Sequence, residues 1–283
     1  MQTVIVDKKY DKKNLSKVLL DTFSGLTMDT FYKALRKKDI RINNIRTNKN
    51  EVVHEGDEIK IFVIDELLYH SFIPQIIYED DNILVVNKPS GIEVVGNANS
   101  LANCLKQIRN SFIEPCHRLD RNTTGLVLFA KNEPALEILL HKFKNREIEK
   151  HYLATVYGIP KIKKQTLTSY LFKDNKKSFV YISDEPRKGY VKIITSYSIL
   201  EKHIKENYSI LDITLHTGKT HQIRAHLAHI GHPILGDGKY GNNQINKQFG
   251  YKTQRLCSYS FTFHFSTNSG ILNYLDGKQI TLA

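Results

Sequence analysis

Residues 116–130 read CHRLDRNTTGLVLFA, a basic and hydroxyl-rich stretch that leads directly into an unbroken apolar run. Residues 125–130, GLVLFA, are apolar at nearly every position, which predicts a strand covered on both faces. The stretch before it holds one carboxylate, Asp120, between Arg118 and Arg121. The pattern therefore predicts a buried strand that anchors a loop, with a single acid surrounded by positive charge.

The chemistry of this loop leaves two interpretations open. The neighbouring arginines would keep the Asp120 carboxylate ionised, and the hydroxyl groups of Thr123 and Thr124 are suited to phosphate oxygens. A lone acid in a basic turn is, however, more often part of a surface salt bridge than a catalytic group. The loop by itself therefore supports either a catalytic carboxylate or an ordinary ion pair.

The composition describes an ordinary globular protein with excess positive charge. The chain has 283 residues, more than one domain usually contains, so we expect two domains. Forty-one Lys and Arg against 29 Asp and Glu give a formal net charge of +12 and a pI near 9.4. This excess favours a polyanionic partner such as nucleic acid, although a lysine-rich solvated surface would give the same total.

The sequence carries no sign of export or membrane insertion. No apolar stretch has the length of a membrane span, and the first residues, MQTVIVDKKYDKKN, lack the apolar segment of a secretory signal. Cys104, Cys116 and Cys257 are widely separated and odd in number, which predicts reduced thiols and argues against a cysteine zinc site. We therefore expect a cytoplasmic protein, and no feature demands more than a monomer.

Residues 1–66 have the pattern of a small separate module. LSKVLLDTF and MDTFYKALRKK carry apolar residues at helical spacing, whereas DIRINNIRT and DEIKIFV alternate as strands do. Leu15, Val18, Leu19, Phe31 and Leu35 are predicted to face the core. The stretches RKKDIRINN and EGDEIKIFV resemble the S4-like RNA-binding domain, although Asp39 stands at that family's usual glycine.

This resemblance implies that residues 1–70 form an RNA-binding domain, whereas a merely solvated basic face is the alternative. The basic residues expected to contact RNA are Lys33, Arg36, Lys37, Lys38 and Arg41. Residues 67–75, LLYHSFIPQ, are predicted to be a linker, because apolar periodicity lapses there and Pro74 discourages continuation. The second domain is placed at residues 71–283.

The second domain is predicted to be α+β, with a large mixed, mostly antiparallel sheet and short flanking helices. A hairpin at residues 76–88 opens it, and the lysine-rich patches KIKKQ and KDNKK are expected in exposed loops. Further strands are predicted at GLVLFA, HYLATVYG, VKIITSYSIL, YSILDITL and YSFTFHF, and helices near LANCLKQIR, ALEILLHKF and THQIRAHLAHI.

Residues 215–240, LHTGKTHQIRAHLAHIGHPILGDGKY, contain a predicted helix that Thr220 caps and that begins at His221. Arg224 lies near the helix N-terminus, where a cation is unfavourable for the helix dipole, so we expect a carboxylate partner elsewhere. The inward stripe would consist of Ile223, Leu227 and Ile230.

Histidines at positions 221, 226, 229 and 232 raise the question of a metal site. Their spacing matches no zinc pattern, since neither HExxH nor a cysteine partner occurs. We therefore expect solvated or RNA-facing histidines and neither a metal nor a cofactor. In KHYLATVYG, residues 150–158, Tyr152 is either a cross-strand core aromatic or a ring that stacks on a base and offers its phenol.

Taken together, three segments resemble the RluA-type pseudouridine synthases, in the same order along the chain. They are HRLDRNTTGLVLFAKN, KHYLATVYG and LHTGKTHQIRAHLAHIGHPILGDGKYG, and EDDNILVVNKPSGIEV resembles the first segment of that catalytic domain. The resemblance covers about residues 76–265. It implies a cofactor-free isomerase that flips a uridine out of ribosomal or transfer RNA and converts it to pseudouridine.

Position by position, the resemblance implies that Asp120 is the nucleophile and that Arg224 pairs with it. Tyr152 would stack on the target uracil and accept a proton, and Arg118 would contact the RNA backbone or fill the space of the flipped base. Lys219 replaces the usual arginine, and Cys257 with Ser258 replaces the usual His-Ala. The further substrate-binding residues are His117, Thr123, Thr124, Lys219, His221 and Ile223.

Two other functions compete with this one. A catalytically silent RNA-binding or ribosome-assembly factor could retain the fold, but it would have no reason to keep Asp120, Tyr152 and Arg224 together. A hydrolytic nucleosidase or phosphate-transfer enzyme is less favoured, because no GxxxxGKS loop occurs and no second acid flanks Asp120. Hydrolysis of a glycosidic bond ordinarily uses two carboxylates and a water, whereas isomerisation uses one carboxylate in a dry pocket.

Overall fold

The computed structural model describes residues 1–23, 25–68, 73–96 and 100–282. The chain divides into two compact units, Met1–Ile73 with Val95–Ile108, and Pro74–Val94 with Arg109–Ala283. The sequence analysis assigned residues 95–108 to the second domain, whereas helix α4, Leu101–Arg109, falls almost entirely in the first unit. No helix among the described residues has the length and apolar character needed to cross a lipid bilayer.

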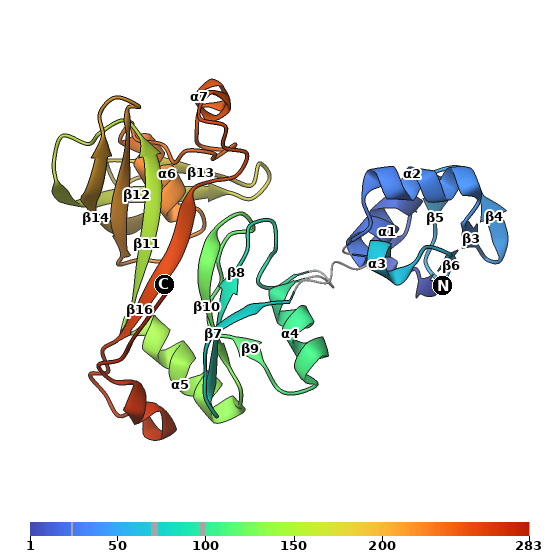
Figure 1. Ribbon diagram of the computed structural model, residues 1–283, viewed down its shortest axis with the longest axis horizontal. Helices are drawn as coiled ribbons and strands as arrows, with labels where there is room; N and C mark the ends of the chain where they lie inside the picture. Colours follow the sequence, from blue (N-terminus) through green and yellow to red (C-terminus); the bar gives the residue numbers. More distant parts are fainter. Residues whose placement is uncertain (24, 69–72, 97–99, 283) are drawn as a thin grey trace. The chain divides into compact units, whose positions relative to one another are not determined.

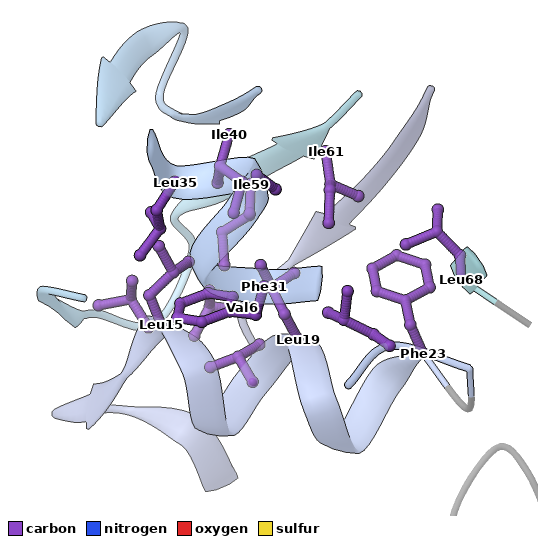
Figure 2. Close-up of a cluster of buried hydrophobic side chains, with 14 residues drawn as sticks. Val6, Leu15, Leu19, Phe23, Phe31, Leu35, Ile40, Ile59, Ile61 and Leu68 are labelled. Atoms are coloured by element: carbon purple, nitrogen blue, oxygen red, sulfur yellow. The ribbon is translucent and has the colours of Figure 1, made fainter. Parts of the chain in front are cut away.

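The first unit packs two helices against a four-stranded sheet of order β1-β6-β3-β4, as counted over the described residues. All five residues predicted to face the core are buried there, in the cluster that Figure 2 shows. Its elements are β1 (Gln2–Ile5), η1 (Lys8–Tyr10), β2 (Lys13–Asn14), α1 (Leu15–Thr22), α2 (Met28–Lys37), β3 (Ile40–Ile42), β4 (Ile45–Thr47), β5 (Val52–Val53), β6 (Glu58–Ile61) and α3 (Asp65–Leu68).

Helix α2 presents a basic face to solvent. Thr27 caps its first turn by accepting a hydrogen bond from the Thr30 N–H, and Lys38 ends it in the left-handed region at φ 59°. Phe31 and its helical neighbours Ala34 and Leu35 turn inward, so the intervening basic residues are exposed. Arg41 is half-buried and lies over the ring of Phe62, 4.9 Å from its centroid, rather than in open solvent.

The predicted linker over residues 67–75 is only partly correct. Leu68 ends helix α3 and is fully buried in the first core, so an apolar side chain anchors this end of the segment. Residues 69–72 of the predicted linker lie outside the described residues. Strand β7 begins at Gln75, directly after Pro74.

The second unit is built on a large sheet, as expected. Over the described residues it has eleven strands, in the order β13-β12-β14-β15-β11-β16-β10-β8-β7, with β17 beside β16 and β9 beside β10. β10 and β16 run parallel, and the other pairs described are antiparallel. Its strands are β7 (Gln75–Glu79), β8 (Ile83–Lys88), β9 (Glu114–Pro115), β10 (Thr124–Ala130), β11 (Ile148–Tyr157), β12 (Lys164–Asp174), β13 (Phe179–Ser183), β14 (Val191–His203), β15 (Tyr208–Leu215), β16 (Leu256–Phe263) and β17 (Gln279–Thr281).

Helices cover this sheet in two places. Helix α5 (Glu133–Lys144) buries Ala135 and Leu139 against β10, and η2 (Gly270–Leu275) joins the same core. Helix α6 (Gln222–His229) lies beside the part of the sheet that contains β12 to β14 (Figure 1), and α7 (Asn243–Gln248) follows it. Ala225 of α6 belongs to the same core cluster as Leu171 of β12 and Ile193 of β14. Strand β16 lies between β10 and β11, and residues of all three strands belong to the core that α5 covers.

Strands β12 and β13 were not predicted. The lysine-rich patches at residues 161–165 and 173–177, expected in loops, extend into the two ends of β12. The loop prediction is therefore partly wrong, and the reason is alternation: β12 buries Leu167, Ser169 and Leu171 on one face, whereas Lys164, Thr166 and Thr168 on the other face are exposed. Lys173 is exposed beyond the last buried residue of the strand, so neither lysine disturbs the core contacts.

Candidate active site

The loop before β10 is fixed by the strand that follows it. β10 pairs with β8 on one side and with β16 on the other, and its residues from Leu126 to Ala130 are fully buried. Gly125 lies at φ 107°, and a Cβ there would overlap the carbonyl oxygen of Ser258. Only glycine therefore lets β16 approach at this point. A turn closed by the Thr123 N–H on the Asp120 carbonyl oxygen presents the acid just ahead of the strand.

A buried lysine ties this loop to the end of β8. The Lys88 ammonium donates hydrogen bonds to three carbonyl oxygens, those of Pro89, Ile92 and Arg121, at 2.8 to 3.0 Å. Burial lowers the pKa of Lys88 to about 8, against the opposing effect of the Asp120 charge. The Lys88 ammonium thus ties the loop that carries Asp120 to the residues that follow β8.

Asp120 pairs with an arginine from a distant helix and not with its sequence neighbours. Nη1 of Arg224 donates to Oδ2 of Asp120 at 2.9 Å. Arg121 donates its Nε–H to the Gly91 carbonyl oxygen, and Arg118 is exposed at the rim. The expectation that the two flanking arginines hold this carboxylate is therefore corrected, because Arg121 bonds to Gly91 and Arg118 is exposed, and neither pairs with Asp120 among the contacts described.

A second carboxylate, that of Asp237, also binds the Arg224 guanidinium. Nε and Nη2 of Arg224 donate to the two oxygens of Asp237, at 2.7 and 3.0 Å, in the two-pronged geometry that suits a guanidinium. Asp237 is 1% exposed, and its Oδ1 also accepts the N–H groups of Lys239 and Tyr240. Burial alone would raise the pKa of Asp237, but the hydrogen bonds and charge of Arg224 hold it below its ordinary value.

His221 faces Asp120 from the start of helix α6. The Val180 N–H donates to the Tyr240 hydroxyl oxygen, which lies 2.8 Å from Nδ1 of His221. Burial raises the pKa of Tyr240 to about 12, so the phenol keeps its proton and donates it to Nδ1. Burial also lowers the pKa of His221, so we infer a neutral ring whose Nε2–H faces Oδ2 of Asp120 at 3.9 Å.

Tyr152 lies across the cavity on strand β11. It pairs with Ile213 of β15 and Ser258 of β16, so its position is fixed from both sides. The side chain is almost fully buried, and burial together with the Asp120 charge raises the pKa of the phenol above its usual range. The site therefore presents a neutral phenol beside the ion pairs that Arg224 makes with Asp120 and Asp237.

These groups meet in one cavity of about 280 Å³, close to the lower end of the range for small-molecule pockets. Of the ten residues that the sequence analysis placed in the active site, nine line this cavity. The exception is Thr124, whose hydroxyl donates to the Leu256 carbonyl oxygen. Thr123 lines the cavity but accepts a hydrogen bond from Gln254, and His117 Nε2 accepts the Leu128 N–H, so both also support the loop.

Comparison with known proteins agrees with this geometry. The sequence profile described as RNA pseudouridylate synthase matches residues 82–229, which include Asp120, Tyr152 and Arg224. The chain belongs to the RNA pseudouridylate synthase family. The RluA-type family and the activity expected from the sequence are thus confirmed, and the chain is an RNA pseudouridine synthase.

Curated relatives of this synthase extend over nearly its whole length. A protein of Rickettsia bellii, named ribosomal large subunit pseudouridine synthase C, is 34% identical over 95% of this chain and 92% of its own. A protein of the same name from Buchnera aphidicola is 31% identical over 93% and 88%. The structure of human RNA pseudouridylate synthase domain containing 1 matches with a TM-score of 0.60 and 24% identity, over 69% of this chain and 80% of that chain, and supports the fold.

The synthase helix α6 differs from the sequence prediction at its start. Its first residue is Gln222, and the residue before it, His221, has a left-handed φ of 54° with no side-chain cap, so Thr220 does not cap the helix. The helix is also buried on more than the predicted stripe, from Gln222 to Leu227. A helix placed against a sheet and beside a cavity has little solvent-facing surface, which a one-sided periodicity cannot reveal.

The histidines of this region have structural partners. His226 is fully buried and lies within hydrogen-bond distance of Thr195 and Ser169, so the prediction that it is solvated or RNA-facing is wrong. His229 pairs with Asp184, and His232 lies 3.1 Å from the Tyr157 carbonyl oxygen. Among the described residues, no three His, Cys, Asp or Glu side chains are grouped as metal ligands would be.

Sequence reasoning missed three members of the synthase site. Asp237 lies in the quoted segment GHPILGDGKY, and the expected carboxylate partner of Arg224 was the signal that could have found it. Tyr240 lies in the same segment, under the guanidinium of Arg224. Lys150 lines the cavity from β11 and had no signal beyond its place in the motif around Tyr152.

Proposed function

We propose that this synthase isomerises a uridine in the RNA of the large ribosomal subunit. The names of its curated relatives support ribosomal RNA over transfer RNA. The observation that carries the mechanism is the Asp120 carboxylate paired with Arg224 in a cavity that also holds Tyr152. We propose further that the enzyme acts as a cytoplasmic monomer.

Asp120 is the proposed nucleophile or charge-stabilising group. The N1–C1′ bond of the uridine breaks, the uracil turns and a C5–C1′ bond forms. C5 loses its proton and N1 gains one, so the product has the composition of the uridine. No water is consumed and nothing is oxidised. Arg224, fixed by Asp237, orients Asp120. Tyr152 stacks on the uracil and is the proposed proton acceptor: because its phenol is protonated, it takes the C5 proton as it passes its own hydroxyl proton on toward N1.

The target base must leave its helix to reach this cavity, because the reacting atoms are inaccessible in a stacked duplex. Arg118 is exposed at the rim, where it would contact the RNA backbone or fill the vacated space. Lys219, His221, Ile223, Thr123 and His117 line the cavity and would surround the base. Thr124 does not line the cavity, and its proposed role is to support the loop through its bond to Leu256.

We propose that residues 1–70 act as an S4-like RNA-binding domain. The support is the exposed basic face formed by Lys33, Arg36 and Lys37 on α2 together with Lys38 at its end. A face of this charge binds phosphates without reading sequence. Arg41 is half-buried over Phe62 and would contribute less than the exposed residues.

The test is a pseudouridine map of ribosomal and transfer RNA from cells that carry wild type or Asp120→Asn, read by carbodiimide labelling and primer extension. We expect specific sites in large-subunit RNA to disappear in the variant, and the purified variant to lose activity by about 10⁴-fold or more. Asp81→Asn, at an exposed turn acid, is the control and should leave the map unchanged. An unchanged map with a purified wild type that lacks activity would identify a silent RNA-binding protein, and release of free uracil would identify a hydrolase.

A further inference from the structure

A second cavity of about 240 Å³ adjoins the catalytic one. Lys219 and Thr220 line both cavities, so the loop that carries them forms a shared wall. The rest of the second cavity comes from Leu171 to Lys173 at the end of β12 and from Gly189 and Val191 at the start of β14.

The second cavity forms because two paired strands separate. Leu171 of β12 pairs with Val191 of β14, and the pairing between the two strands ends there. Phe172 and Lys173 continue to pair with β13 on their other side. Their edge toward β14 is therefore unpaired, and the chain before Val191 forms a turn closed by the Tyr190 N–H on the Arg187 carbonyl oxygen.

An aromatic ring is presented at this opening. Phe172 is 38% exposed, although a ring of this size usually lies in a core. Tyr190 stacks on it with ring centroids 5.4 Å apart and an interplanar angle of 29°. Gly189, at φ 82°, lies beside the ring, where a Cβ would meet its edge at 3.8 Å. The ring is thus supported by neighbours while part of its surface stays accessible.

The charge of the second cavity favours an anionic ligand. Two of its lining residues, Lys173 and Lys219, are cationic, and none is acidic. An exposed ring next to cations is the combination by which proteins bind unpaired RNA, with the base on the ring and the phosphate near the ammonium groups. Lys219 lies at the boundary of the two cavities, where a phosphate that joins two consecutive nucleotides would lie.

We propose that the second cavity binds the nucleotide next to the target uridine, with its base stacked on Phe172 and the linking phosphate at Lys219. The inference rests on the proposed function, because it requires the target uridine in the catalytic cavity. It also names the substrate class: the RNA must be unpaired at two consecutive positions at least, since a base that stacks on a protein ring has left its helix.

The test is a double-mutant cycle on an RNA hairpin built around the uridine that the enzyme modifies. Wild type and Phe172→Ala are each assayed on the intact hairpin and on hairpins with an abasic nucleotide 5′ or 3′ of the target. We expect Phe172→Ala to raise KM about tenfold with kcat unchanged, as for loss of one base–aromatic stack. One abasic hairpin should raise KM of the wild type by a similar factor and leave the KM of Phe172→Ala unchanged.

Two further variants separate stacking from a structural effect. Phe172→Tyr keeps the ring and should restore the wild-type KM to within about twofold. Leu200→Ala, at an exposed apolar residue of β14 outside both cavities, should leave KM unchanged on all hairpins. The proposal is wrong if Phe172→Ala raises KM by the same factor on intact and abasic RNA, or does not raise KM on either. A wild type that makes no pseudouridine would instead overturn the proposed function.

Discussion

Arg224 is bound by carboxylates on two sides, and the tighter contact is to the acid that does not face the cavity. Asp237 takes two of its donors and Asp120 takes one. The single hydrogen bond from Arg224 to Asp120 orients the proposed nucleophile and engages only one of its two oxygens. Asp237 is thus a positioning residue, because it fixes the guanidinium that orients Asp120.

Replacing Asp237 tests this arrangement. We expect Asp237→Asn to lower the free energy of unfolding by about 3 kcal/mol, because it leaves a buried guanidinium without its full partner. We also expect kcat to fall about tenfold or more with little change in KM, because Arg224 would no longer hold Asp120 in place. Asp184→Asn, at an exposed acid, should change stability by about 0.5 kcal/mol or less. A wild-type kcat for Asp237→Asn would show that Asp120 is oriented by other contacts.

A substitution at Tyr152 can separate the contribution of its ring from that of its hydroxyl group. Tyr152→Phe keeps the stacking surface and removes the proposed proton acceptor, so kcat should fall about 10²-fold or more while KM changes by less than about threefold. Steady-state kinetics on modified RNA would measure both constants. Tyr197→Phe, at another buried tyrosine of the same sheet, serves as the control, since its hydroxyl bonds only to Gln165 in the contacts described. A full kcat in Tyr152→Phe would leave Tyr152 with stacking alone.

At the scale of elements, β11 divides its side chains between two environments. Tyr152 lines the cavity, whereas the next residue back, His151, joins Asp212 of β15 and Glu149 in an ionic cluster. Its hydrogen bond to Asp212 raises the pKa of His151 above its ordinary value, aided by the charges of both acids and opposed by burial. The same strand therefore carries a proposed catalytic group and a pH-dependent contribution to stability.

The sign of this pH dependence follows from the raised pKa. The protonated form of His151 is favoured in the folded state, so its contribution is fully present below about pH 6.5 and is lost as the pH rises through the raised folded pKa. We expect His151→Gln to lower the free energy of unfolding more at about pH 5.5 than at about pH 9. Urea unfolding at the two pH values would measure this. The difference should shrink in an Asp212→Asn background, where only Glu149 is left to pair with His151, and equal losses at both pH values would contradict the assignment.

At the scale of the whole molecule, the net charge of +12 predicts binding that depends on salt. Arg36 and Lys37 lie exposed on α2, far in sequence from the catalytic residues. Replacing both with alanine should weaken RNA binding and reduce the slope of log Kd against log salt by about one for each lost phosphate contact. The value of kcat at saturating RNA should not change.

Lys8→Ala with Lys9→Ala is the matched control for that experiment, because these residues are equally exposed and basic but lie outside the proposed RNA-binding face. Titration of a fluorescent RNA at several salt concentrations would give both slopes. The control variant could reduce the slope of log Kd against log salt as much as the α2 variant does. In that case the positive charge acts through no particular face, and the S4-like assignment of residues 1–70 is unsupported.

Several features could be predicted from the sequence because they depend on neighbouring residues. The run GLVLFA becomes the buried strand β10, and the apolar spacing of α2 places Phe31 and Leu35 in the first core. The ordered motifs around Asp120, Tyr152 and Arg224 identify the family. In each case the signal is a local pattern whose meaning does not depend on the distance between segments in space.

Other features were decided only by the tertiary structure. The partner of Arg224 at its Nε side is Asp237, Arg121 is turned away from Asp120 toward Gly91, and β12 forms despite its lysines. The physical reason is that strand register and the packing of α6 against the sheet set which side chains meet, and a shift by one residue would reverse every face. The sequence by itself determined the chemistry available to this enzyme, and the fold determined which charges are paired.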